Sequence, residues 1–183
     1  MSHPRQGSTV RSRRVVTAPT ELTGALGSPR VRRMISASLV LGQVALVLLV
    51  LVPAGPVLWS GREGLGWALV VIGALVGALG LLGLGRDTRV TPVPASGGRL
   101  HRNGIYAFVR HPMYLGLALL CLGATLISGR LLALVSLLLL IGLLTAKARV
   151  EDLILQRKFG WEFAVYSVRV PAIVPQPWRS HRR

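Results

Sequence analysis

The sequence is poor in cysteine and lacks the common motifs of soluble enzymes. Its one cysteine, Cys121, lies in an apolar stretch and cannot by itself form a disulfide or a cysteine-based metal site. The four histidines lack the paired spacing of zinc sites, so no metal centre is expected. No glycine-rich phosphate loop and no serine nucleophile elbow is present.

Acidic residues and aromatic rings are also scarce. Six Asp and Glu stand against 22 Lys and Arg, which gives a net charge of +16, and aromatic residues make up 5% of the chain. Such a charge can indicate nucleic-acid binding, but the sequence has no basic patch interleaved with aromatic residues and no known reading motif. No nucleic-acid partner is expected.

Long uncharged stretches are abundant instead. The chain is 51% hydrophobic with a mean hydropathy of +0.56, which is typical of a membrane protein. A membrane-crossing helix needs about 20 apolar residues, with about 17 as the lower limit. The uncharged stretches are residues 34–52, 64–85, 112–129 and 131–146.

The last two stretches form one run interrupted only by Arg130. As a single helix this run would be roughly 50 Å long, which exceeds a hydrocarbon core of about 30 Å. A reversal at Ser128, Gly129 and Arg130 gives two short antiparallel helices instead. The sequence therefore predicts an all-α integral membrane protein with four transmembrane helices, of which the last two form a tight hairpin.

The basic residues set the predicted orientation. Lys and Arg number 7 in residues 1–33, 5 in residues 86–111 and 8 in residues 147–183, with one in residues 53–63 and one at the 128–130 turn. By the positive-inside rule, both termini and the central loop are cytoplasmic. We expect an uncleaved multi-pass protein of a bacterial inner or plasma membrane.

This interpretation divides the chain into four segments. Gly73 and Gly77 of the second span have GxxxG spacing, which predicts close helix packing within the chain. The segments are a disordered basic tail (1–33), two N-terminal transmembrane helices (34–85), a core made of a loop, the hairpin and a C-terminal segment (86–175), and a basic tail (176–183).

Residues 102–116, RNGIYAFVRHPMYLG, place charged and aromatic groups at a membrane boundary. Pro112 can occupy the first turn of a helix, which puts Arg110 and His111 at its positive end. Exposed amide donors at that end favour an anionic group such as a carboxylate or phosphate. This run is a candidate binding site.

A second polar segment follows the hairpin on the same predicted side, with Lys147, Arg149, Glu151 and Asp152. Ionisable groups beside a span are costly unless paired or used, so this concentration also marks a candidate site. For Arg149 and Asp152, ordinary interfacial charge is an equally good explanation. Adjacent Glu151 and Asp152 point about 100° apart on a helix and do not form a face-to-face acid pair.

At these residues the chain resembles a family of integral-membrane methyltransferases. The resemblance rests on GIYAFVRHPMYLG and, one helical hairpin later, RVEDLILQRKFGWEFAVYSVRVPAIVP, and it covers roughly residues 86–175. The family includes isoprenylcysteine carboxyl methyltransferase and the phospholipid N-methyltransferases. The order and spacing of both blocks make the match fairly specific.

The resemblance implies S-adenosylmethionine as the cofactor, surrounded by residues from both blocks. In prenylcysteine enzymes an Arg one turn before the Glu is associated with the methyl acceptor, and Lys147 stands there, with the charge but not the bidentate fork. His111 or Glu151 is a candidate base for an acceptor that arrives protonated. We also expect Arg110 to bind the cofactor, because its charge suits the methionyl carboxylate. The cofactor-binding residues that the resemblance implies are Leu100, His101, Tyr106, His111, Pro112, Met113, Tyr114 and Glu151.

The predicted function is S-adenosylmethionine-dependent methyl transfer to a lipophilic small molecule or lipid at the interface of membrane and cytosol. Two alternatives come from other classes: an NADPH-dependent membrane reductase of the sterol-reductase type, and a non-enzymatic anchor that binds anionic lipid. The apolar walls do not discriminate among a carboxylate, an amine, a phenol or a thiol as the acceptor.

Overall fold

The computed structural model describes residues 29–84 and 100–174, with residues 29–36 described by their backbone alone. The chain divides into two units, Met1–Ile35 and Ser36–Arg183, and all contacts below are within the second. Most of the predicted N-terminal tail, the first part of the predicted cofactor loop and the C-terminal tail lie outside the described residues.

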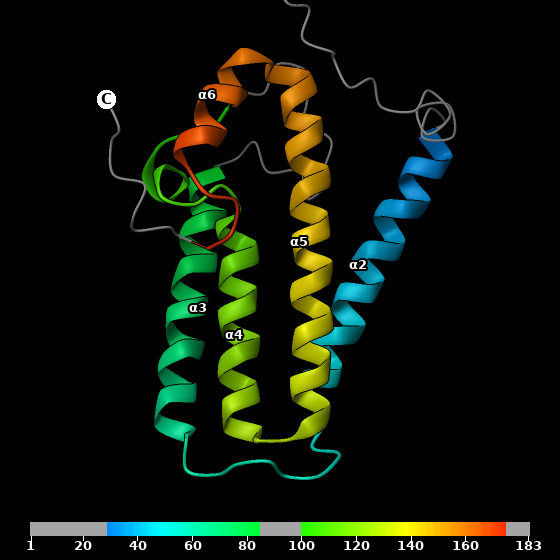
Figure 1. The fold of residues 1–183 in the computed structure, drawn as a ribbon, viewed down its shortest axis with the longest axis vertical. Coiled ribbons are helices and arrows are strands. Elements are labelled where there is room, and N and C mark those ends of the chain that lie inside the picture. The colour runs from blue at the N-terminus through cyan, green and yellow to red at the C-terminus, as the bar shows by residue number, and fades with distance from the viewer. Residues whose placement is uncertain (1–28, 85–99, 175–183) are drawn as a thin grey trace, which may run out of the picture. The chain divides into compact units, whose positions relative to one another are not determined.

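The described residues are helical, as predicted. They form five α-helices and one 3₁₀ turn, and the one isolated β-bridge among them pairs Val57 with Arg130. The elements are α2 (Pro29–Leu51), α3 (Glu63–Leu84), η2 (Gly104–Ala107), α4 (Pro112–Ser128), α5 (Leu131–Phe159) and α6 (Trp161–Arg169), coloured in chain order in Figure 1.

Two of these helices, α3 and α5, are long and apolar enough to cross a membrane. Two more are apolar but shorter: the Ala37–Leu51 part of α2, and α4 with 17 residues. Many large apolar side chains on α2, α3 and α5 are exposed, as helices facing lipid require. The four-span topology stays a prediction.

The reversal between α4 and α5 lies where the sequence predicts it. Gly129 ends α4 with φ 61° and ψ 15°, the left-handed conformation that glycine adopts most easily, and its N–H donates to the Thr125 carbonyl at 2.9 Å. A Cβ on Gly129 would lie 2.1 Å from the Trp59 carbonyl oxygen. The turn therefore requires glycine for both its conformation and its space.

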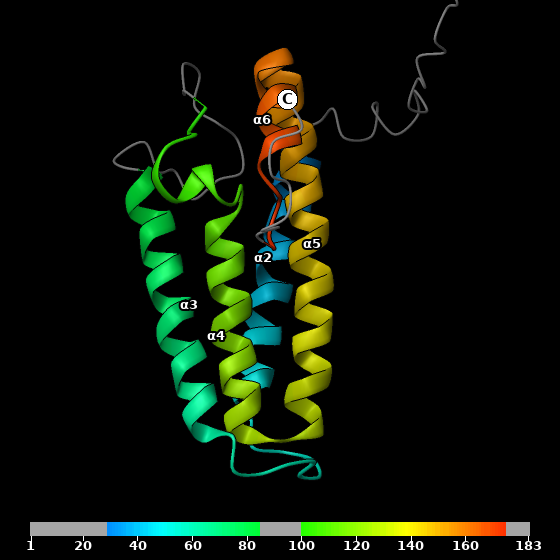
Figure 2. The ribbon, with the colours of Figure 1, turned by 60° about the vertical axis from the view of Figure 1, so that its left-hand side comes forward.

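Helix α4 packs closely along α3, and Figures 1 and 2 both show the two side by side. A Cβ on Gly73 would lie 2.7 Å from the Gly116 carbonyl oxygen, and a Cβ on Gly116 would lie 2.6 Å from the Gly77 nitrogen. The predicted packing of Gly73 and Gly77 within the chain is confirmed. Gly66 and Gly123 make a second close approach, because a Cβ on Gly123 would lie 2.4 Å from the Gly66 carbonyl oxygen.

Helix α5 continues beyond the predicted span and ends at Phe159. The second polar segment is thus the last part of the helix that includes the predicted fourth span. Gly160, the C-cap residue of α5, has φ 51° and donates its N–H to the Gln156 carbonyl at 2.9 Å. There the chain turns into α6, which buries Phe163 and Tyr166 on one face.

Candidate functional site

The first block of the resemblance, GIYAFVRHPMYLG, leads into α4 and pairs with the segment after α6. His111 is the N-cap of α4 and Pro112 occupies its first turn, as predicted. The backbone N–H of Arg110 donates to the Pro171 carbonyl, and that of His111 donates to the Ala172 carbonyl, both at 2.9 Å. The chain just before α4 is therefore tied by its backbone to the C-terminal segment.

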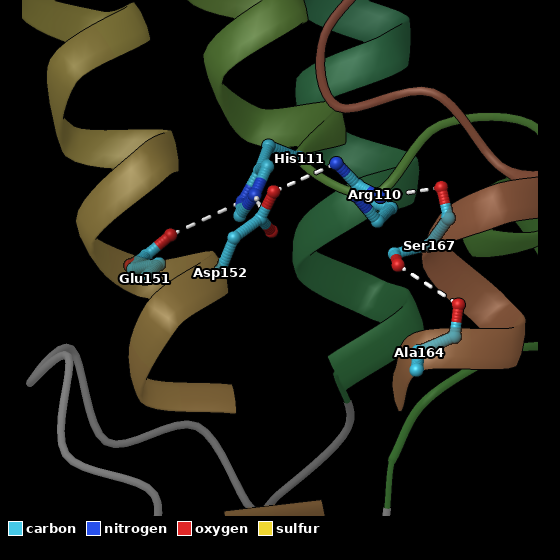
Figure 3. Close-up of polar contacts among 6 residues, drawn as sticks. All are labelled: Arg110, His111, Glu151, Asp152, Ala164 and Ser167. Atoms are coloured by element: carbon cyan, nitrogen blue, oxygen red, sulfur yellow. Dashed lines mark hydrogen bonds and ion pairs between the residues drawn. The ribbon is translucent and has the colours of Figure 1, made fainter. Parts of the chain in front are cut away.

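The side chain of His111 lies between two carboxylates of α5, as Figure 3 shows. Its Nδ1 is 3.1 Å from Glu151 Oε2 and its Nε2 is 3.0 Å from Asp152 Oδ1. The imidazole is 7% exposed. The side chains of Glu151 and Asp152 point in different directions from the helix, but both contact His111 because the two imidazole nitrogens lie on different edges of the ring.

Burial acts to lower the pKa of His111, but the carboxylates outweigh it. Hydrogen bonds and charge interactions with Asp152 and Glu151 raise the pKa above the ordinary value of 6.5. The imidazolium form donates through both nitrogens. Arg110, His111, Glu151 and Asp152 form a charged cluster. With His111 protonated, this cluster has two cations and two anions, which reduces the cost of burying charge at a membrane boundary.

Arg110 is the second cation of this cluster. Its Nη2 donates to Asp152 Oδ2 at 2.7 Å, and its Nη1 donates to the Ser167 carbonyl of α6 at 2.8 Å. The guanidinium lies 5.7 Å from the centroid of the Phe163 ring. Its Nε is buried without a hydrogen-bond partner. Asp152 thus gives one carboxylate oxygen to each cation and joins His111 to Arg110.

Tyr114 and Lys147 extend the cluster along α4 and α5. The Tyr114 ring stacks on His111, with centroids 5.5 Å apart and planes inclined by 17°. The Lys147 ammonium lies 5.1 Å from the centroid of the same tyrosine ring. Predicted cofactor-side and acceptor-side residues therefore meet at Tyr114.

Pro112 and Met113 lie against α3. A Cβ on Gly80 would be 3.0 Å from Pro112 Cγ and 3.1 Å from Met113 Cγ. Pro112 is buried and Met113 is 40% exposed. These two residues pack the start of α4 onto α3.

Tyr106, His101 and Leu100 lie around η2 and α6. The Tyr106 hydroxyl donates to the Gly80 carbonyl of α3 at 3.1 Å, and burial, then Tyr166 and Glu151, raise its pKa to about 12. The His101 ring is 6.3 Å from the Tyr106 ring, and Leu100 packs with the buried rings of α6. The Tyr106 hydroxyl therefore links η2 to α3. His101 lies next to the Tyr106 ring, and Leu100 packs on the neighbouring α6.

Several residues of the site were missed or left open by the sequence prediction. Asp152, which had an equally good interfacial explanation, contacts both Arg110 and His111, whereas Arg149 is exposed. Phe163 and Ser167 of α6 were not predicted to contact Arg110. The available signal was the three-residue spacing of Phe163 and Tyr166, which is typical of one helix face but does not show what that face covers.

A protein-family model described as phospholipid methyltransferase matches residues 62–162. The chain belongs to this family. The match includes α3, η2, α4 and α5 with every residue of the charged cluster, and it begins earlier and ends earlier than the resemblance in the sequence. Neither the curated proteins nor the solved structures searched gave a match.

Membership of the phospholipid methyltransferase family confirms the membrane methyltransferase resemblance. It supports methyltransferase activity in general and, with the two long apolar helices, membrane association. It favours methyl transfer over the reductase and anchor alternatives.

Proposed function

We propose that this protein transfers a methyl group from S-adenosylmethionine to a lipophilic acceptor at the cytoplasmic boundary of the membrane. The observation that supports this most is the charged cluster itself. In it, Arg110 and His111 at the start of the apolar helix α4 contact Glu151 and Asp152 of the second block. In a chain of the phospholipid methyltransferase family, this cluster is the best candidate for the cofactor site.

The proposed topology has four spans, with both termini and the cluster in the cytosol. The turn at Gly129 and the cluster lie at opposite ends of α4, since the cluster is at its first residue and the turn follows its last. The concentration of Lys and Arg on the cluster side supports its cytoplasmic location.

The residues of the cluster have the chemistry that this cofactor needs. Arg110 has a buried Nε donor without a partner and suits the carboxylate of the methionyl group. Glu151 suits the ammonium group or the ribose hydroxyls. Tyr114, whose ring stacks on His111 of the cluster, is a candidate for contact with the adenine.

When bound, the cofactor supplies a methyl group on a positively charged sulfur. The protein's own contribution is to exclude water and to align the acceptor with that methyl group. A base is needed only for an acceptor that arrives protonated. Glu151 is then the better choice, because the raised pKa of His111 favours an imidazolium that has no free lone pair.

Binding of S-adenosylhomocysteine to the detergent-purified protein tests this proposal. We expect measurable binding that weakens by at least about tenfold in Glu151→Gln and His111→Gln. The matched control is Glu162→Gln, which removes an exposed carboxylate paired with Arg102 and should bind as the wild type does. Well-folded wild-type protein that does not bind would refute the proposed function.

A further inference from the structure

Residues 170–174 follow α6 and lie beside the start of α4 (Figure 1). They read VPAIV and carry no charged side chain. The Pro171 carbonyl accepts the Arg110 N–H and the Ala172 carbonyl accepts the His111 N–H, both at 2.9 Å. The segment is therefore held at the level where the apolar helix α4 begins.

Three exposed side chains lie within two residues of these backbone pairs. Phe108 precedes Arg110 and is 71% exposed, and Val174 follows Ala172 and is 69% exposed. Arg169, the last residue of α6, is also exposed. Two exposed apolar groups with one exposed cation suit a medium that offers both hydrocarbon and anionic groups.

The headgroup layer of a bilayer has this character and a matching depth. It is about 5–7.5 Å thick on each side, since a hydrocarbon core of about 30 Å lies within a bilayer of about 40–45 Å. Two residues of extended chain span at most about 7 Å. The backbones of Phe108, Arg169 and Val174 therefore lie within about one headgroup layer of the pairs at the start of α4.

Trp161 shows that exposure alone does not mark this layer. It is 81% exposed, but it follows α5, which continues from Lys147, the first charge after its apolar run, to Phe159. At about 1.5 Å per residue, the end of α5 lies roughly 18 Å beyond that charge, which is farther than the headgroup layer extends. Trp161 is thus a reference for an exposed side chain in water.

We propose that residues 170–174 and Phe108 form a surface that inserts into the cytoplasmic headgroup layer of the protein's own bilayer, with Arg169 bound to lipid phosphate. This inference goes beyond the proposed function and rests on the topology proposed with it. The apolar side chains gain by leaving water, and a guanidinium binds phosphate with two N–H donors. Because the same segment accepts the N–H groups of Arg110 and His111, its contact with lipid also holds the charged cluster at the membrane surface.

Nitroxide labels on the full chain in nanodiscs of phosphatidylcholine test this surface. Each labelled variant carries Cys121→Ala, so that the introduced cysteine is its only thiol. The labels replace Phe108, Val174, Trp161 and, as a reference in lipid, the exposed Leu75 of α3. Collision with oxygen, which concentrates in hydrocarbon, is compared with collision with a polar nickel chelate, which stays in water.

We expect the ratio of oxygen to nickel collisions at Phe108 and Val174 to exceed the ratio at Trp161 by at least about threefold and to stay below the ratio at Leu75. A ratio equal to that at Trp161, at either position, overturns the inference. Little collision with either reagent shows that protein, such as a second copy of this chain, covers the surface in place of lipid, and this also overturns the inference.

Two charge reversals test the phosphate contact through the label at Val174. Arg169→Glu should lower the ratio toward that at Trp161, because phosphate repels a carboxylate. The matched control is Arg157→Glu, which reverses an exposed charge near the end of α5, beyond the headgroup layer, and should leave the ratio unchanged. Equal effects of the two variants overturn the phosphate contact.

S-adenosylhomocysteine binding, measured on the same samples, tests the proposed function separately. Protein that binds but has the ratio of Trp161 at Phe108 and Val174 refutes only the inference. Protein that does not bind but has the expected ratios supports the inference and refutes the proposed function. A ratio at Leu75 as low as that at Trp161 refutes the proposed topology and the inference with it.

Discussion

The two ends of the α4–α5 hairpin are held by different kinds of contact. At the turn, the partners are mainly backbone groups: the Leu58 N–H donates to the Gly129 carbonyl at 2.6 Å, and the Leu131 N–H donates to the Pro56 carbonyl at 3.0 Å. Even the Arg130 guanidinium donates to a backbone carbonyl, that of Gly55.

At the open end, charged side chains hold one another. Arg110 and His111 precede α4, and Glu151 and Asp152 lie on α5. Backbone contacts depend on conformation and have a fixed geometry, whereas ion pairs can exchange partners for the charged groups of a ligand. The comparison indicates that the turn end fixes the hairpin and that the open end is the end able to bind.

The largest effect is expected at the turn, from Gly129→Ala. The left-handed conformation costs roughly 1–2 kcal/mol for a residue with a Cβ. Displacing the Trp59 carbonyl adds to this, for a total loss of about 3 kcal/mol. Thermal unfolding in detergent measures the loss.

The control at this end is Arg130→Ala, which removes only an exposed side-chain contact and should cost no more than about 0.5 kcal/mol. Equal stability of the two variants would contradict the backbone account of this end.

An intermediate effect is expected at the open end, from Asp152→Ala. The change leaves Arg110 Nη2 and His111 Nε2 without their carboxylate, at a cost of about 2 kcal/mol for a partly buried pair. Asp152→Asn keeps an acceptor and should cost less. Unfolding and S-adenosylhomocysteine binding are measured together, and we expect both to weaken.

The exposed pair of Arg102 and Glu162 provides the contrast for Asp152. Arg102→Ala should change stability by no more than about 0.5 kcal/mol. If Asp152→Ala is equally mild, the cluster does not stabilise the open end.

The smallest effect is a dependence of stability on pH that passes through His111. Its raised pKa means that the folded state binds the proton more tightly than the unfolded state. The stabilisation is therefore fully present below the ordinary value of 6.5 and is lost as pH rises through the folded pKa. We expect the melting temperature of the wild type to fall by a few degrees between about pH 6 and about pH 9, relative to His111→Gln.

The groups that face His111 in this range are the Glu151 and Asp152 carboxylates and the Tyr114 ring, with Arg110 bound to the same Asp152. Tyr106 and Tyr166 have pKa values raised to about 12 and do not titrate in this range. A wild-type curve parallel to that of His111→Gln would show that the imidazolium does not stabilise the fold.

Local signals in the sequence predicted most of the helix boundaries. Pro112 starts α4 and Gly129 ends it, because each residue has a backbone preference that acts within a single turn. Hydropathy located the apolar helices for the same reason. It did not show that α5 continues to Phe159, since hydropathy detects where an apolar run ends and not where a helix ends.

The partners of the site were harder to predict. The sequence brought Arg110, His111 and Glu151 to one site, but it did not single out Asp152 as their link, because a carboxylate at a helix end is usual on a cytoplasmic face. Backbone groups pair Arg110 and His111 with Pro171 and Ala172, about sixty residues later in the chain. Such pairing does not depend on side-chain type, so the sequence did not predict it.

Transfer of a labelled methyl group tests the central claim most directly. Membranes containing the protein are incubated with S-adenosylmethionine labelled in its methyl group, and the label is counted in the lipid extract. We predict incorporation above membranes without the protein, and a fall of at least about tenfold in His111→Gln and Glu151→Gln but not in Glu162→Gln. No incorporation above background, or equal incorporation by the cluster variants, would contradict the assignment of the charged cluster as a methyl-transfer site.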